Sequence, residues 1–238
     1  MSAASVNCRG LGNHATVSEL RDFVKKYAPT ILCVVETQLH KVCVEKLAPT
    51  LGFDKAFAVS SYGRKGGIGM FWNSNLKVEI LPYSQYHLDA IVQENNGDRW
   101  RFTCVYGEAQ SNLRHKTWDI LKFVHSSSDL PWLKMGDFNE VLHQHEHAGL
   151  VNRSHSQMEG FREMTNVCGL QDLGYKGHWW TYEKKVVGGT FCRVRLDRAL
   201  ATTDWSARYP LATVTNMTAA TSDHGPILLR WKIGRAHV

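Results

Sequence analysis

PWLKMGDFNE, residues 131–140, joins a mostly apolar run to a turn rich in acidic and amide side chains. The run 131–135 predicts a short buried strand, and Gly136 marks the point where that strand leaves the core. In an extended segment the side chains of Asp137 and Asn139 would lie on the same side, where a carboxylate and an amide can hold one water or phosphate oxygen. By itself the motif also fits an ordinary turn. Its meaning therefore depends on whether other strands end in the same way.

Other apolar runs are also followed or accompanied by acidic, amide or imidazole side chains. Glu36 comes directly after the run 31–35. Asn7 and the pair Asp223-His224 are also expected where the chain leaves the core beside a strand. Carboxylates gathered from separate strand ends repel one another unless a cation neutralises them, and oxygen ligands suit Mg²⁺ or Mn²⁺ better than zinc. A carboxylate beside an imidazole can also orient the ring and raise its pKa. We therefore expect a hard-metal site where these strand ends meet.

Hydrophobic periodicity predicts alternating helices and strands without an internal repeat. Thr16 and Glu19 form a capping-box pattern that begins a predicted helix ending before Pro29. Further helices are expected at 42–51, 113–124 and 156–167. Strands are expected at 31–35, 53–59, 68–72, 78–81, 87–92, 100–106, 131–135, 179–182, 190–194, 212–216 and 227–231. Tight turns between the strands from 53 to 106 imply an antiparallel sheet, and the whole pattern predicts two sheets with helices outside, in one domain.

Length and composition set broader limits. The chain has 238 residues, 43% hydrophobic and 21% charged, which fits one folded domain with a sizeable core and excludes a disordered or fibrous protein. Its apolar runs fall far short of the roughly 20 residues that a membrane span needs, so we expect no membrane partner. The formal charge of +6 favours a polyanionic partner without requiring one. The six cysteines contain no Cys-x-x-Cys pair, which suits free thiols in a reducing, intracellular compartment.

The motifs, in this order, resemble those of the endonuclease/exonuclease/phosphatase superfamily, which includes apurinic/apyrimidinic endonucleases and deoxyribonuclease I. The matching stretches are 6–12, 35–37, 66–72, 136–140, 195–200 and 222–226. More narrowly, the sequence looks like the endonuclease domain of plant LINE-type non-LTR retrotransposons in NCRGLG at 7–12, CGLQDLG at 168–174 and RLDRAL at 195–200. The resemblance implies an α/β fold, a four-layer α/β sandwich of two mostly antiparallel sheets packed face to face with helices outside.

The resemblance further implies a phosphodiesterase that binds a divalent metal, Mg²⁺ or Mn²⁺, and acts on DNA. By motif matching, the metal ligands would be Glu36, Asn7 and Asp223. Asp137 would position or deprotonate the attacking water, and Asn139 would orient that water and contact the substrate. The chemistry expected is in-line attack on phosphorus, with charge on the non-bridging oxygens stabilised by the metal, imidazole and amide.

The same resemblance gives roles to four further positions. Asp223 would hold His224, which would contact the scissile phosphate. Asp197 would support the site or a second metal, and Tyr106 would be a tyrosine that faces the phosphate. Whether His224 or Asp137 is the general base stays open at this stage.

Arg9 and Trp180 are two further candidates for contact with the substrate. Many superfamily members have an acidic metal ligand where this sequence has Arg9. An arginine cannot bind Mg²⁺, so either the site uses fewer ligands or Arg9 contacts phosphate as a substrate-binding residue. Trp180, in the aromatic run 179–182, is a candidate for stacking on DNA, although aromatic residues in strands more often belong to the core.

The functional expectation is a Mg²⁺-dependent endonuclease that nicks one DNA strand, as target-primed retrotransposition requires. The alternatives are a decayed element-derived domain that only binds nucleic acid and a superfamily phosphatase acting on a small phosphate ester. Residues 233–238, IGRAHV, resemble a translated sequencing adapter, so the domain is expected to span 1–232 with a non-native tail. We expect a monomer that is nuclear by function, although no import signal is visible. The resemblance leaves room for a reverse transcriptase domain in a longer natural protein.

Overall fold

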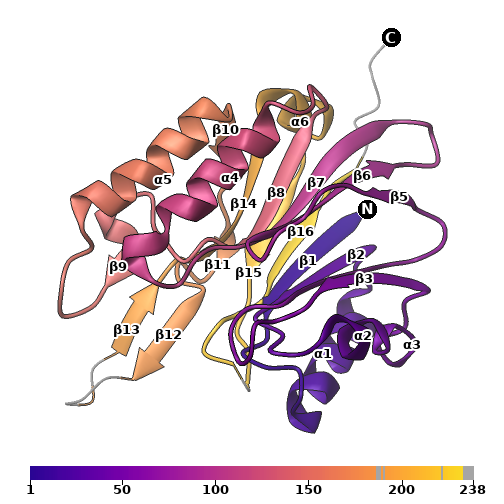
Figure 1. The fold of residues 1–238 in the computed structure, drawn as a ribbon, viewed down its shortest axis with the longest axis horizontal. Helices are drawn as coiled ribbons and strands as arrows, with labels where there is room; N and C mark the ends of the chain where they lie inside the picture. The colour runs from indigo at the N-terminus through magenta and orange to yellow at the C-terminus, as the bar shows by residue number, and fades with distance from the viewer. Residues whose placement is uncertain (186–188, 190, 221, 233–238) are drawn as a thin grey trace.

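The computed structural model describes residues 1–185, 189, 191–220 and 222–232, and two large sheets pack face to face within it (Figure 1). The seven-stranded sheet has the order β11 (Lys176–Gly177), β15 (Thr213–Asn216), β16 (Ile227–Arg230), β1 (Ser2–Asn7), β2 (Ile31–Val35), β4 (Ile68–Trp72) and β3 (Lys55–Val59). The six-stranded sheet has the order β10 (Leu170–Asp172), β14 (Asp197–Thr202), β8 (Trp132–Asp137), β7 (Arg99–Tyr106), β6 (His87–Gln93) and β5 (Lys77–Ile80).

Most neighbouring strands in these sheets are antiparallel, but each sheet has a parallel pair near its centre. β1 runs parallel to β2, and β7 runs parallel to β8. Parallel neighbours end at the same edge of a sheet, so these pairs deliver several side chains to one end of the molecule. The strands of both pairs are almost continuously buried, because helices cover the outer face of each sheet.

Three hydrophobic clusters fill the spaces between four layers. The central cluster lies between the sheets and alternates along the strands, with residues such as Cys33 and Val35 facing Phe102 and Leu133. A second cluster packs the seven-stranded sheet against α1 (His14–Tyr27), α2 (Lys41–Glu45) and α3 (Ala48–Leu51). A third packs the six-stranded sheet against α4 (His115–His125) and α5 (His155–Val167) (Figure 1). The four-layer sandwich expected from the sequence is therefore confirmed.

The remaining elements are short. α6 (Thr203–Arg208) follows β14, and 3₁₀ turns occupy Ser111–Leu113 and Gln144–Glu146. β12 (Tyr182–Lys185), β13 (Phe191–Val194) and β9 (His147–Ala148) form a third small sheet that the sequence did not predict. In Figure 1 the β12–β13 hairpin projects from the lower left of the sandwich. No helix in the described part of the chain is both long and apolar enough to cross a membrane.

Several local predictions were wrong. The strands expected between 53 and 106 do not share one sheet, because the chain crosses after β4 from the seven-stranded to the six-stranded sheet. α1 begins two residues before Thr16, and its cap is Asn13, whose side chain accepts from the backbone N–H of Ala15. The run 179–181 is not a strand, since β12 begins at Tyr182. The proposed tail 233–238 and the first residue of the strand expected at 190–194 lie outside the described residues.

A buried ion network fixes the chain just before β14. Glu146 Oε1 lies 2.9 Å from Arg195 Nη1, and Glu146 Oε2 lies 3.0 Å from Arg198 Nη2. Asp172, on β10, accepts from the same two arginines at 2.7 and 2.9 Å. Burial raises the pKa of Glu146, but the two arginines outweigh it and lower that pKa to about 2. The network therefore holds two buried guanidinium groups beside the first residue of β14, Asp197.

Candidate active site

Polar side chains from both large sheets meet at one end of the sandwich. Asn7 ends β1, and Glu36 follows the neighbouring parallel strand β2. In the other sheet the parallel pairing of β7 with β8 sets Tyr106 opposite Asp137, and the antiparallel β14 sets Asp197 opposite Asp137 as well. A hydrogen bond of 2.9 Å from Asn7 Nδ2 to Asp137 Oδ2 joins the two sheets at this end. The strand ends singled out in the sequence thus converge.

Asp137 is a buried carboxylate at the centre of this arrangement. Besides Asn7, it accepts a hydrogen bond of 2.8 Å at Oδ1 from the backbone N–H of Asn139. Burial and the adjacent carboxylate of Asp197 raise the pKa of Asp137 well above the usual range of aspartate, although His224 and the two hydrogen bonds partly offset them. A carboxylate whose pKa is moved toward neutrality is suited to accept a proton from water.

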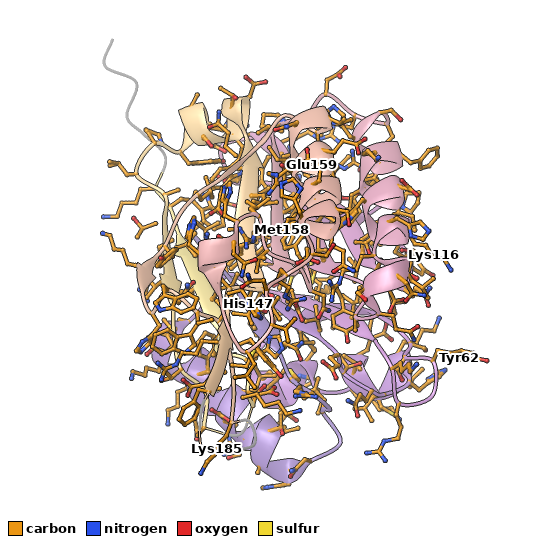
Figure 2. All side chains as sticks on the ribbon, turned by 90° about the vertical axis from the view of Figure 1, so that its left-hand side faces the viewer. Tyr62, Lys116, His147, Met158, Glu159 and Lys185 are labelled. Atoms are coloured by element: carbon orange, nitrogen blue, oxygen red, sulfur yellow. The ribbon has the colours of Figure 1, made fainter. Side chains whose placement is uncertain are left out.

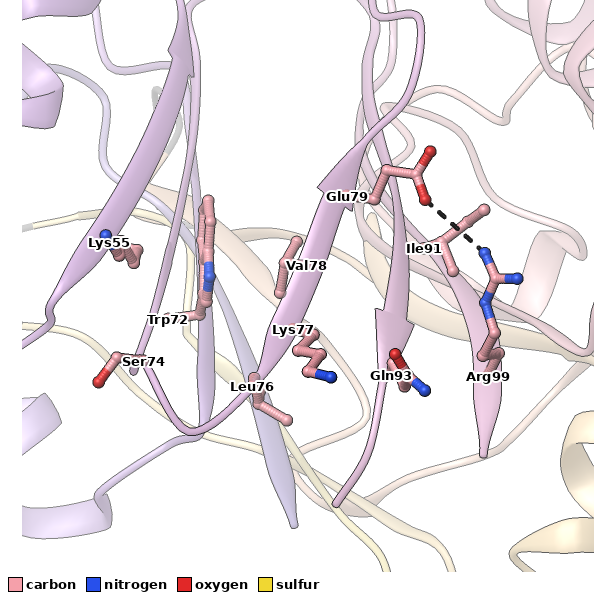
Figure 3. A pocket seen from close by; sticks show the side chains of 10 residues that line it. All are labelled: Lys55, Trp72, Ser74, Leu76, Lys77, Val78, Glu79, Ile91, Gln93 and Arg99. Atoms are coloured by element: carbon pink, nitrogen blue, oxygen red, sulfur yellow. Dashed lines mark ion pairs between the residues drawn. The ribbon is translucent and has the colours of Figure 1, made fainter. Parts of the chain in front are cut away.

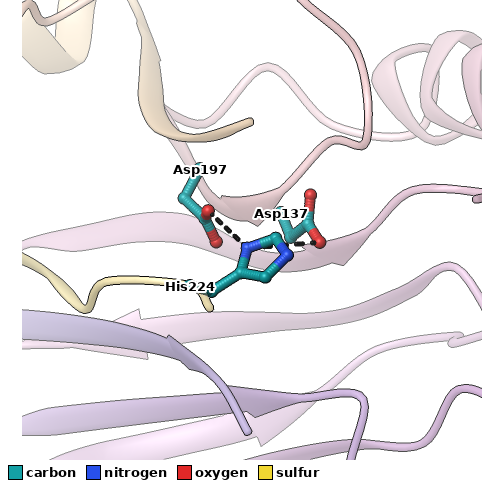
Figure 4. A group of neighbouring side chains, drawn as sticks. All are labelled: Asp137, Asp197 and His224. Carbon is teal, nitrogen blue, oxygen red and sulfur yellow. Dashed lines mark hydrogen bonds and ion pairs between the residues drawn. The ribbon is translucent and has the colours of Figure 1, made fainter. Parts of the chain in front are cut away.

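His224 lies against two carboxylates, as Figure 4 shows. Its Nδ1 is 2.9 Å from Asp197 Oδ2 and 3.9 Å from Asp137 Oδ2. Burial lowers the pKa of His224, but Asp197 and Asp137 outweigh it and raise that pKa to about 9. The ring is therefore an imidazolium at neutral pH. The sequence prediction that Asp223 holds His224 was wrong, because the hydrogen bond goes to Asp197.

Asp223 instead faces Arg9. Its Oδ2 accepts from Nη1 of Arg9, and the Nε atom of the same guanidinium lies 3.9 Å from Oε1 of Glu36. The other carboxylate oxygen of Asp223, Oδ1, is buried and has no hydrogen-bond partner among the residues that the structure describes. Arg9 therefore sits between two of the carboxylates that the sequence identified as metal ligands.

Asn139 and Tyr106 complete the inner part of the site. Asn139 has a left-handed backbone, φ 56°. The segment from Asp137 is therefore not extended, and the geometry considered from the sequence does not apply. Its side chain turns toward β7 and donates from Nδ2 to the carbonyl of Gly107 at 2.8 Å. Tyr106 is half-buried beside it, and burial together with Glu36 and Asp137 raises its pKa. The Tyr106 hydroxyl therefore stays protonated beside Glu36.

Trp180 borders the site without belonging to the core. It is half-buried, and it lines a small cavity of about 100 Å³ together with Thr181 and Asp223. The guanidinium carbon of Arg193 lies 4.3 Å from the centre of its ring. An indole face in contact with a cation, at the margin of the site, is compatible with either DNA stacking or local packing.

Two residues that the sequence did not single out hold the site together. Thr181 is buried, and its Oγ1 accepts from the backbone N–H groups of Leu196 and Asp197 at 3.0 and 2.8 Å. Ser222 Oγ donates to the carbonyl of Asn7 at 3.0 Å and accepts from the backbone N–H of His224 at 3.1 Å. No sequence signal identifies Thr181, whereas Ser222 stands directly before the Asp-His pair.

Replacing Thr181 with valine is expected to lower the free energy of unfolding by about 3 kcal/mol, because two buried N–H groups lose their acceptor while the side-chain volume is kept. Urea unfolding measures this change. Thr181→Ser retains the hydroxyl and is the matched control, with a much smaller loss expected. Equal stability of the two variants would show that the hydroxyl does not hold the start of β14.

The residues present fit a divalent cation on the side of Glu36 and Asp223. These two carboxylates already share one cationic partner, and Asp223 keeps a buried oxygen that no described residue bonds. Asp137, Asp197 and His224 also place potential ligand atoms within 4.8 Å of one another. In that group, however, the imidazole Nδ1 is already bonded to Asp197, and a protonated ring cannot bind a metal. We therefore favour Glu36 and Asp223 as the metal-binding side.

A larger hollow lies elsewhere. It measures about 530 Å³ and opens between the edge strands of the two sheets, at the strand ends remote from Asp137 (Figure 3). Its charged side chains include Lys55, Lys77 and the ion pair of Arg99 with Glu79, 3.7 Å apart. The cluster of Asp137, Asp197 and His224 lies at the opposite strand ends, so size alone does not locate the site.

The model of the endonuclease/exonuclease/phosphatase family matches residues 4–224, so the chain belongs to this family. Its members are divalent-metal-dependent enzymes that cleave phosphoesters, and the family expected from the ordered motifs is thereby confirmed. A comparison with curated proteins gives no match.

Solved structures share the fold over nearly the whole chain. An AP endonuclease from Leishmania major, LMAP, superposes with a TM-score of 0.77 at 17% identity, covering 98% of this chain and 87% of that one. A 3'-5' exonuclease from Neisseria meningitidis gives 0.74 at 15%, covering 98% and 100%. The endonuclease domain of TRAS1, a telomere-specific non-LTR retrotransposon, gives 0.73 at 14%, covering 98% and 99%. At these identities the similarity concerns the fold.

Proposed function

We propose that this protein is a Mg²⁺- or Mn²⁺-dependent endonuclease that nicks one strand of DNA. The observation that carries the proposal is the buried group in which Asn7 from one sheet bonds Asp137 of the other, while Asp137 lies beside the Asp197–His224 pair. This group combines a proton acceptor, a fixed cation and neutral amide donors within one hydrogen-bonded network. In-line attack on a phosphodiester needs these three functions.

Asp137 is the residue we assign as the proton acceptor. His224 is already protonated at neutral pH because two carboxylates raise its pKa to about 9, so it cannot take a proton from water there. It can instead donate a hydrogen bond from Nε2 and place positive charge beside the non-bridging phosphate oxygens. Asn139 holds the backbone loop after Asp137, since its side chain bonds Gly107. This choice between the two candidate bases rests on the hydrogen bonding and charge of the site.

Glu36 and Asp223 are the residues we propose for the metal, with Asn7 beside them. When bound there, Mg²⁺ or Mn²⁺ would supply positive charge that neutralises the phosphate oxygens as the bond breaks. Asn7 links this side to Asp137, because its Nδ2 bonds the carboxylate and its Oδ1 accepts from the backbone N–H of Arg9 at 3.1 Å.

Two elements that border the site support DNA as the substrate. The β12–β13 hairpin carries Lys185 at its far end, and the loop between β3 and β4 carries Tyr62, whose side chain projects into solvent and is 88% exposed (Figure 2). Arg193 and Trp180 lie at the base of the hairpin. Cations and exposed aromatic rings on either side of a phosphodiesterase site suit a long polyanionic ligand, and the formal charge of +6 is in keeping with it.

The biological setting we propose is target-primed retrotransposition. The structural similarity to the TRAS1 endonuclease domain supports it, together with the plant LINE-like stretches at 7–12 and 195–200. In that setting the nicked strand would be the primer that a reverse transcriptase domain in the longer natural protein extends. The enzyme would act in the nucleus.

Supercoiled plasmid is the substrate that tests the proposal. We expect conversion to the open circular form with Mg²⁺ or Mn²⁺, and none with a chelator. His224→Ala should slow nicking by about a hundredfold or more, because the fixed cation beside the phosphate is lost. The matched control is His145→Ala, a histidine that is exposed and outside the site, which should nick like the natural chain.

The alternatives give different results in the same assay. DNA binding without nicking by the natural chain would indicate a decayed binding domain. Release of inorganic phosphate from small phosphate esters, with the plasmid left intact, would indicate a phosphatase. Equal nicking rates of the natural chain and His224→Ala would contradict the assignment of His224 to the active site.

A further inference from the structure

Arg9 is a cation placed among residues that should bind one. Its guanidinium pairs with Asp223 through Nη1 and lies 3.9 Å from Glu36 through Nε. Within the described part of the chain, the second oxygen of Asp223 is buried without a hydrogen-bond partner, so the arginine satisfies this carboxylate only in part. Among the described residues, therefore, Arg9 is the cation that these two carboxylates share, and Glu36 also accepts a hydrogen bond of 3.3 Å from Nε2 of Gln38.

The backbone holds Arg9 in this place firmly. Arg9 has a positive φ of 44°, which is uncommon for a residue with a side chain and costs about 1 kcal/mol or more. Hydrogen bonds from Cys8 N to Val35 O and from Gly10 N to Glu36 O, of 3.0 and 2.8 Å, fix the residues on either side. The Arg9 N–H itself bonds the side chain of Asn7. The loop after β1 is thus locked onto the end of β2, and only the arginine side chain is free to change its partners.

The side chain has room to move. It is 46% exposed, in contrast to the buried arginines of the ion network beside β14. A guanidinium binds phosphate and carboxylate oxygens with the same planar fork of N–H groups, so a phosphate can take the place of a carboxylate. A divalent cation at Glu36 and Asp223 would compete directly with the arginine for the same oxygens.

We propose that Arg9 is the internal counter-ion of Glu36 and Asp223 before metal binds, and that metal binding transfers its guanidinium to a phosphate of the DNA strand. Metal and DNA binding are then coupled through one side chain, since each ligand favours the state in which Arg9 has left the carboxylates. This inference rests on the proposed function, because it takes the metal and DNA as its ligands.

Titration of Mn²⁺ alone, without DNA, tests the first half of the inference. Arg9→Gln removes the competing charge and is expected to bind Mn²⁺ about fivefold more tightly than the natural chain, as measured by isothermal titration calorimetry. Arg9→Lys keeps a cation and should stay close to the natural affinity. Arg99→Gln is the matched control, because Arg99 is 51% exposed, pairs with Glu79 and lies at the opposite strand ends. Its Mn²⁺ affinity should not change by more than about twofold.

A duplex that already contains a nick with a 5′-phosphate tests the second half, since that position offers no further bond to cut. For the natural chain, adding this duplex should tighten Mn²⁺ binding several-fold, because the DNA takes over the arginine. In Arg9→Gln the duplex should tighten Mn²⁺ binding clearly less than in the natural chain, because only the direct attraction between metal and phosphate is left, and the duplex itself should bind more weakly. Fluorescence anisotropy of a labelled strand measures DNA binding. Arg9→Gly suits the left-handed backbone and is a second charge-removing variant should Arg9→Gln fail to fold.

The outcomes separate this inference from the proposed function. Equal Mn²⁺ affinities of the natural chain and Arg9→Gln, with metal-dependent nicking intact, would overturn the role of Arg9 alone. Tighter Mn²⁺ binding by Arg9→Gln together with an equal effect of the duplex on both proteins would overturn the transfer to phosphate. A natural chain that neither binds Mn²⁺ nor nicks plasmid would overturn both proposals.

Discussion

Asp137→Asn is expected to reduce the rate of plasmid nicking by about a thousandfold, because it removes the group that takes the proton from the attacking water. The change should cost no more than about 1 kcal/mol of stability. Burial and Asp197 already disfavour the charged form of Asp137, as its raised pKa shows, so a neutral side chain relieves repulsion while losing the hydrogen bond from Asn7. The expected result is therefore an inactive protein with a nearly unchanged fold.

Nicking rates and urea unfolding on the same preparations check both halves of this expectation. Asp129→Asn makes the same chemical change on an exposed loop residue and should nick at the natural rate. If Asp137→Asn retained more than a tenth of the natural activity, the proton acceptor would have to be another group. A large loss of stability would instead mean that Asp137 is a structural residue.

Glu146→Gln is expected to lower the free energy of unfolding by about 3 kcal/mol at pH 7. Of the described residues, the neutral side chain leaves Asp172 alone as an acidic partner of the buried Arg195 and Arg198, and an uncompensated buried charge is costly. Glu159→Gln is the matched control. Glu159 pairs with Arg162 on the surface of α5, 60% exposed, and such a solvent-exposed pair contributes little to stability.

The ionisation of Glu146 makes the stability of the fold depend on pH. The pKa of Glu146 is about 2 in the folded protein and near the ordinary glutamate value of 4.5 in the unfolded chain, so the ionised side chain stabilises the fold above about pH 5. This contribution is lost as the pH falls from about 5 toward 2. Urea unfolding at several pH values should show the natural chain and Glu146→Gln converging over that range. A constant difference between them would mean that the charge of Glu146 is not what stabilises the fold.

The sequence predicted best the strands that consist of one uninterrupted apolar run. β2 and β4 begin and end where the apolar runs 31–35 and 68–72 do, because helices and the opposing sheet bury both of their faces. β1 was missed as a full strand since its residues are mainly small, Ser and Ala among them, and the position between β2 and β16 is what buries it. The N-terminal cap of α1 was misplaced because two side chains, Asn13 and Thr16, both suit a cap.

The sequence predicted which residues form the site, but not which of them are hydrogen-bonded to one another. Asn7, Asp137, Asp197 and His224 do converge, as motif order suggested. The partner of His224 could not be read from the chain, since Asp223 is its neighbour in sequence whereas Asp197 reaches it through the pairing of β14 with β8. Thr181 was missed for the same reason, because its role depends on backbone N–H groups that are fifteen and sixteen residues away. Tertiary contacts of this kind leave no local pattern.

The pairing of β1 with β16 brings the first described residue next to one of the last. The backbone N–H of Trp231 bonds the carbonyl of Met1 at 3.0 Å, at the strand ends opposite Asn7 and His224. In Figure 1 both ends of the described chain accordingly leave from one side. A protein fused at Met1 or after Lys232 would start from the face turned away from the candidate active site. The two ends could also be joined by a short linker and the chain reopened in a surface loop such as 126–131, which would give a circularly permuted nuclease with the same catalytic edge.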